Sequence, residues 1–96
     1  MAAKQKGVSE ELQYIPLDDP TVVLTTFDLG AAAALAHIGF ELISLDRENP
    51  KKIKFIFQRD RLIDEAIKEY WAGTLSVGAR SYFDSIKMLK NRIYSE

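Results

Sequence analysis

The sequence predicts an α+β fold: a three-stranded sheet, in β-α-β-β-α-α order, with the helices packed mainly on one face. Three observations support this fold class. Short β-branched or aromatic runs at 21–26, 40–45 and 52–58 are typical of strands. Segments 28–38, 61–72 and 76–94 carry apolar residues at helical spacing. Glycine or turn-forming residues separate most of these runs.

The composition is that of one small domain. The chain has 96 residues, no cysteine and a formal net charge of −1. Without cysteine it has neither disulfides nor thiolate metal ligands. No apolar run approaches the roughly 18–20 residues of a membrane span, and no signal peptide is evident. We therefore expect a cytoplasmic protein with no membrane association.

The first twenty residues differ from the rest. They are polar and charged, and four carboxylates fall within residues 8–20 without a cation. We expect residues 1–20 to form a flexible or docking N-terminal arm. Residues 21–96 should form a single α+β domain.

The first strand leads directly into a helix. Thr26 or Asp28 can cap that helix, and Gly39 can end it. Its expected apolar face consists of Leu29, Ala32, Ala33 and Ala36. If the first two strands were neighbours, this helix would make a right-handed parallel crossover.

The next two strands suggest an antiparallel hairpin, because turn-forming residues 46–50 separate them. In the third strand, the apolar residues Ile53, Phe55 and Phe57 occupy alternate positions and so share one face. The apolar set should face the core. The other face should present Lys52, Lys54, Ile56 and Gln58.

Two further helices complete the domain. Asp60 should cap the first and Gly73 should end it, and Ser76 should cap the second. The expected core-facing stripes are Leu62, Ile63, Ala66, Ile67, Tyr70 and Trp71, then Ala79, Phe83, Ile86, Leu89 (or the Lys90 stem) and Ile93. We expect Trp71 and Phe83 in the core, whereas Tyr70 and Tyr82 can reach the surface.

Several segments together resemble a known family. They are Thr25-Thr26-Phe27-Asp28-Leu29, Gly39-Phe40, Leu45-Asp46-Arg47, Phe55-Ile56-Phe57, Tyr70-Trp71-Ala72-Gly73-Thr74-Leu75, Tyr82-Phe83 and Leu89 to Tyr94. Across residues 22–94 the chain resembles a small bacterial and phage family catalogued only as a domain of unknown function. That resemblance implies an accessory protein of phages or mobile elements. It implies neither an activity nor any functional residue.

No catalytic or metal-binding pattern is evident. His37 is the only histidine, so typical zinc sites and histidine-assisted triads lack partners. Asp60 with Asp64, and Asp46 with Glu48, are better explained by capping and turns. The sequence has no nucleophile elbow and no phosphate loop. We therefore expect a protein that is not an enzyme and needs no cofactor or metal.

Basic residues give the sharpest positive signal. Those of the hairpin and of the last helix are candidate nucleic-acid or partner contacts: Arg47, Lys51, Lys52, Lys54, Arg59, Arg80 and Lys87. Lysines on the outer face of a strand could follow a phosphate backbone. Alternatively, they could protect an exposed edge strand against pairing with another chain.

Two functions fit these observations. The first is a non-catalytic protein-interaction module, acting on a protein partner or as a homo-oligomer. The alternative is an accessory nucleic-acid-binding protein that uses the basic hairpin and the basic side of the C-terminal helix. A third, weaker hypothesis is an anionic ligand at a helix N-terminus, near 26–29 or 76–78.

Overall fold

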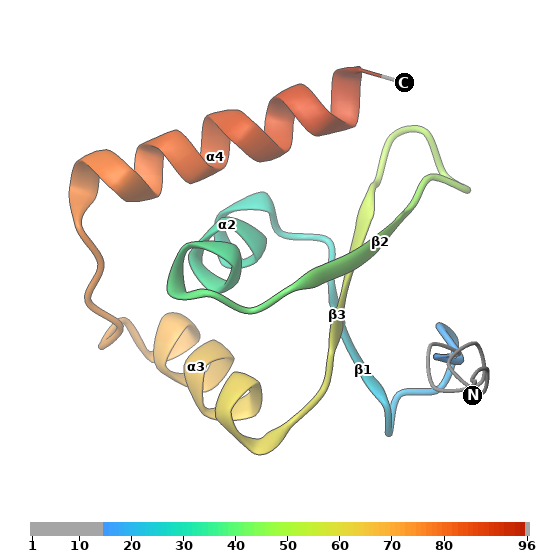
Figure 1. The fold of residues 1–96 in the computed structure, drawn as a ribbon, viewed down its shortest axis with the longest axis horizontal. Helices are drawn as coiled ribbons and strands as arrows, with labels where there is room; N and C mark the ends of the chain where they lie inside the picture. The colour runs from blue at the N-terminus through green and yellow to red at the C-terminus, as the bar shows by residue number, and fades with distance from the viewer. Residues whose placement is uncertain (1–14, 96) are drawn as a thin grey trace, which may run out of the picture.

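The computed structural model describes residues 15–95, so residues 1–14 of the expected arm lie outside the described residues. The elements follow the predicted order (Figure 1). They are β1 (Val23–Thr26), α2 (Leu29–Ile38), β2 (Leu42–Asp46), β3 (Lys54–Gln58), α3 (Arg61–Ala72) and α4 (Ala79–Tyr94). The α+β class is therefore confirmed. No helix within residues 15–95 is both long and apolar enough to cross a membrane.

The sheet places β3 at its centre. The strand order is β1-β3-β2, and both pairings are antiparallel. The first two strands are not neighbours, so the parallel crossover considered above does not form. The edge-strand explanation for Lys54 is also wrong, because β3 pairs on both sides. The edge strand β2 carries a register shift between Leu42 and Ser44, an irregularity that discourages pairing with other chains.

The core lies between one face of the sheet and the helices (Figure 1). Phe55 and Phe57 of β3 are fully buried there, as predicted, and Ile53 packs partly against them. Ile63 of α3 and Leu89 of α4 join the same cluster. Burying each of these side chains contributes about 1.5–3 kcal/mol relative to leaving it exposed.

Helix α2 is the central element of the helical layer. Figure 1 shows it between α3 and α4, and the five consecutive residues Ala31–Leu35 are essentially inaccessible. The sequence predicted that only one face of α2 is buried. The structure buries more of the helix, because other elements cover α2 from several directions. Small side chains allow this, since they let neighbouring elements approach the helix backbone closely.

The helix termini follow the sequence with one exception. Asp28 and Asp60 accept hydrogen bonds from the backbone amides of Ala31 and Ile63, each at 2.8 Å, as expected for N-caps. Gly39 and Gly73 end α2 and α3 with positive φ angles. Ser76 was the wrong choice of cap: residues 74–78 form an irregular link, and α4 begins after Gly78 without a side-chain cap.

Candidate functional site

Three helices meet at the N-terminus of α2. The Tyr82 hydroxyl, from α4, donates a 2.9 Å hydrogen bond to the carbonyl oxygen of Gly30. The Tyr70 hydroxyl, from α3, donates a 3.5 Å hydrogen bond to the same Asp28 oxygen that caps α2. We call Asp28, Gly30, Tyr70 and Tyr82 the helix junction. These polar contacts tie α3 and α4 to the start of α2.

Gly30 leaves room for the two tyrosines. A Cβ atom at this position would lie 2.6 Å from the Tyr70 hydroxyl and 3.2 Å from the Tyr82 hydroxyl. The first distance is shorter than side chains tolerate, so a residue larger than glycine would displace the junction. Gly30 lies inside a helix and not at a turn, so its role is to let the two tyrosine hydroxyls approach the backbone of α2 closely.

The junction is a fixed polar joint near neutral pH. Burial, the negative charge of Asp28 and the neighbouring Tyr82 together raise the pKa of Tyr70 to about 12. Tyr70 therefore keeps its proton at neutral pH and acts as a hydrogen-bond donor. The Asp28 carboxylate occupies the first amides of α2. It repels other anions, which counts against an anionic ligand near residues 26–29.

Trp71 lies outside the core, contrary to prediction. Its side chain is 62% exposed, and its ring packs edge-to-face with the Tyr70 ring, with the centroids 5.0 Å apart and the planes at 82°. Leu62 is also exposed, and so are Ala79 and Phe83 on α4. The core-facing stripes of α3 and α4 are thus narrower than predicted, because α2 is a slender helix of small residues and covers only one strip of each.

The hairpin lysines gather around an exposed ring. Lys52 Nζ lies 4.6 Å and Lys54 Nζ 5.8 Å from the centre of the Phe27 ring. Lys54 also approaches Asp46 across the sheet, at 3.9 Å. This combination of ring and cations was not anticipated. Phe27 follows β1 directly and faces the hairpin only because β1 pairs with β3.

The remaining candidate cations do not join this group. Arg47 turns towards the end of α4 and donates to the carbonyl oxygens of Ile93 (2.7 Å) and Arg92 (3.0 Å). Arg59 lies beyond the far end of β3 and pairs with Asp64 at 3.5 Å. Lys51 is exposed beside the hairpin turn. The other two candidates lie on α4: Arg80, and Lys87 with its Asp84 partner at 3.8 Å.

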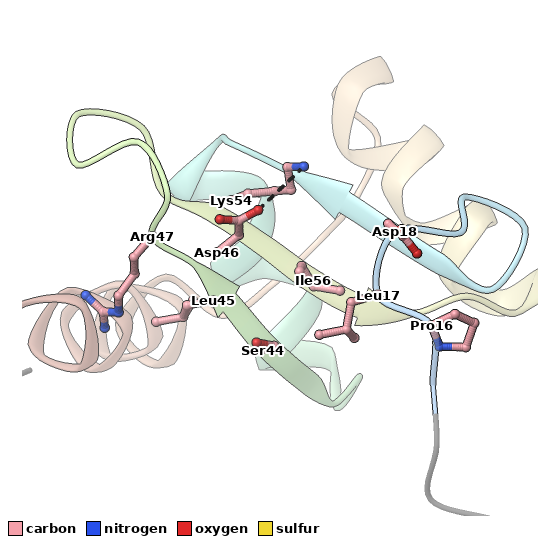
Figure 2. A pocket seen from close by; sticks show the side chains of 9 residues that line it. All are labelled: Pro16, Leu17, Asp18, Ser44, Leu45, Asp46, Arg47, Lys54 and Ile56. Atoms are coloured by element: carbon pink, nitrogen blue, oxygen red, sulfur yellow. Dashed lines mark ion pairs between the residues drawn. The ribbon is translucent and has the colours of Figure 1, made fainter.

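A hollow of about 430 Å³ opens on the outer face of the sheet. Figure 2 shows that Leu17, from the segment before β1, lies beside Ile56 of β3 on this face. The lining mixes apolar side chains with both charges, and includes Asp18, Asp46 and Lys54. Within residues 15–95, no three potential metal ligands converge, here or elsewhere.

The helix junction is not apparent from the sequence. The clue was Gly30, placed inside a helix just before a run of alanines, because small residues in series imply close neighbours. Which neighbours approach could not be inferred, since Tyr70 and Tyr82 lie 40 and 52 positions further along the chain.

Comparisons with known proteins agree with the extent of the fold. A family model described as "Domain of unknown function (DUF5659)" matches residues 22–95. That range contains every strand and helix described above. No curated protein and no solved structure matches the chain.

Proposed function

This chain belongs to the DUF5659 family, a family of domains of unknown function, and we propose that it acts as a non-catalytic protein-interaction module. The observation that carries this proposal is the position of Trp71. An exposed tryptophan is the kind of side chain that contributes most to protein–protein binding. A phage or mobile-element origin and a cytoplasmic location remain predictions.

The surroundings of Trp71 favour a binding role. Tyr70 packs edge-to-face with the indole, and its hydroxyl donates a hydrogen bond to Asp28. The aromatic ring therefore has a defined neighbour before any partner arrives. A side chain that is already ordered loses less conformational entropy on binding, so more of its burial appears as affinity.

The charges favour a protein partner over nucleic acid. Two of the candidate cations, Arg47 and Arg59, already bind groups of this domain. The formal net charge is −1. Such a molecule attracts a polyanion only weakly.

Affinity purification with matched variants tests the proposal. The full chain, a Trp71→Ala variant and a Leu62→Ala variant would each be used as bait in a lysate of the producing cell. Leu62 is the control, because it lies on the same helix and is 60% exposed. We expect the wild type and the Leu62→Ala variant to retain a partner protein that the Trp71→Ala variant does not retain. Equal retention by all three, with no self-association of the wild type by light scattering, would refute the proposal.

Nucleic-acid binding is a second candidate function, favoured by the arrangement of Phe27, Lys52 and Lys54. An exposed ring flanked by lysines could stack on a base while the ammonium groups contact phosphates. Fluorescence polarisation with labelled single-stranded DNA and RNA tests it. Binding should weaken with salt and fall in Phe27→Ala and Lys52→Ala, but not in Lys68→Ala on α3. Absence of binding at low salt would eliminate this function.

A further inference from the structure

One flank of α4 carries a row of exposed side chains. Phe83, Lys87, Lys90 and Tyr94 are separated by four, three and four residues, the spacing by which one helix contacts another. We call these four residues the α4 stripe. They run beside the core-facing residues Tyr82, Ile86, Leu89 and Ile93. Over its length the stripe extends about 16 Å.

The stripe is apolar at both ends and basic in the middle. Phe83 is 56% exposed and Tyr94 79% exposed. Lys87 Nζ lies 5.1 Å from the centre of the Phe83 ring, so its aliphatic stem covers apolar surface while its charge stays accessible. Lys90 is exposed between the two ends.

Charge decides which partner fits. The stripe and the α4 positions next to it carry three cations (Arg80, Lys87 and Lys90) and one carboxylate, Asp84, which forms an exposed 3.8 Å pair with Lys87. A second copy of α4 packed on the stripe would bring the central lysines towards like charges, which is unfavourable. A helix with glutamates at the middle positions and apolar side chains at both ends would complement the stripe in charge and in shape.

We propose that the α4 stripe docks an acidic amphipathic helix of a protein partner. This inference rests on the proposed interaction function and adds the chemistry of the partner. The Phe83 and Tyr94 rings contact the partner's apolar residues, and Lys87 and Lys90 contact its carboxylates. The attraction is partly electrostatic, so binding weakens as salt concentration rises.

The experiment uses two synthetic helical peptides that differ only in charge. One carries leucines at heptad spacing with glutamates beside them, and the other has lysines in place of the glutamates. Binding to the full chain is measured by isothermal titration calorimetry. We expect the glutamate peptide to bind and the lysine peptide not to bind. In Lys87→Glu/Lys90→Glu, affinity for the glutamate peptide should fall about tenfold or more, and the lysine peptide should bind instead.

A matched variant separates local from overall charge. Lys51→Glu/Lys52→Glu changes the net charge by the same amount but lies on the hairpin, so it should retain affinity within about twofold. Circular dichroism confirms that both variants are folded. Equal loss in both, no binding of the glutamate peptide, or preference of the stripe for single-stranded DNA over that peptide would each overturn the inference. In these cases a partner that depends on Trp71 would leave the proposed function intact.

Discussion

The Tyr82 hydroxyl of α4 donates a 2.9 Å hydrogen bond to the carbonyl oxygen of Gly30, which lies 52 positions earlier in α2. That carbonyl belongs to the first turn of α2, so the bond fixes where α4 crosses the central helix. Tyr70 makes the equivalent connection from α3 through Asp28. The helix junction therefore determines how the two outer helices are presented to a partner.

Gly30→Ala should destabilise the domain by about 1–3 kcal/mol. The new methyl group would lie 2.6 Å from the Tyr70 hydroxyl, so α3 has to move or the hydrogen bond to Asp28 breaks. Urea denaturation monitored by circular dichroism measures the change in the free energy of unfolding.

Two comparisons identify the cause of that loss. Gly78→Ala should cost less than about 1 kcal/mol, because Gly78 has an ordinary negative φ and faces only the movable Ser81 hydroxyl. In a Tyr70→Phe background, Gly30→Ala should cost less than in the wild type, because the clashing oxygen is absent. An equal cost in both backgrounds would contradict the assigned contact.

Stability should fall between pH 10 and pH 12 because of Tyr70. The folded state raises its pKa from 10.0 to about 12, chiefly by burial. In this window the unfolded chain has lost the hydroxyl proton and the folded chain still binds it. The unfolded state therefore binds fewer protons, and the free energy of unfolding decreases as pH rises. The contribution is complete below pH 10 and lost above pH 12.

Variants isolate the contribution of Tyr70 to this decline. Tyr70→Phe should show a shallower decline between pH 10 and pH 12 than the wild type. Tyr94→Phe should match the wild type, because the structure leaves that side chain 79% exposed. Urea midpoints across this pH range provide the measurement, and identical declines in all three proteins would contradict the role of Tyr70.

Local patterns predicted the elements and most of their ends correctly. Asp28 and Asp60 lie directly before apolar helical periods, and Gly39 and Gly73 directly after them. Capping depends on residues within one turn, which a sequence displays. The alternation around Phe55 and Phe57 likewise identifies the face of β3 that joins the main core. It does not predict that Ile56, on the opposite face, is also buried, with 4% of its surface exposed.

Contacts between distant segments were less predictable. Helical periodicity places Trp71 and Phe83 near the apolar stripes, but the width of the buried strip depends on what covers the helix. Here α2 is narrow, and both side chains remain outside. The position of β3 at the centre of the sheet was equally hard to predict, because strand order depends on how the connections cross.

Arg47→Ala should loosen the end of α4. The guanidinium donates to the carbonyl oxygens of Ile93 and Arg92, which lie in the last turn, beyond the reach of intrahelical amide donors. The Arg92 oxygen also accepts from the Ser95 hydroxyl at 3.1 Å. We expect a loss of about 1–2 kcal/mol in the free energy of unfolding and faster amide hydrogen exchange in the last turn. Arg47→Lys should recover only part of this loss, because an ammonium group lacks the planar pair of donors.

Arg92→Ala is the control for this prediction. It leaves the accepting carbonyl in place and removes only an exposed side chain, so hydrogen exchange in the last turn should match the wild type. If Arg47→Ala and Arg92→Ala changed exchange equally, loss of positive charge near the helix end, rather than the two hydrogen bonds, would be responsible.

Leu17→Ala should release the segment before β1 without unfolding the domain. Leu17 lies beside Ile56 on the outer face of the sheet but is still 41% exposed, so its truncation should cost only about 1 kcal/mol. Limited proteolysis should cut residues 15–22 faster in this variant. The Leu62→Ala control, on α3, should be cut at the wild-type rate, and equal rates in all three proteins would contradict the contact.

The fluorescence of Trp71 reports its exposure in the free protein and whether a partner covers it. It is the only tryptophan and is 62% exposed, so the folded protein should emit close to the wavelength of the unfolded chain and be quenched readily by acrylamide. Trp71→Ala should lower the free energy of unfolding much less than Phe57→Ala. The Phe57→Ala variant leaves a cavity at a fully buried position and should cost about 3–5 kcal/mol. A partner that covers the indole should shift its emission to shorter wavelength and reduce quenching. Strongly protected emission in the free protein would instead place Trp71 in the core.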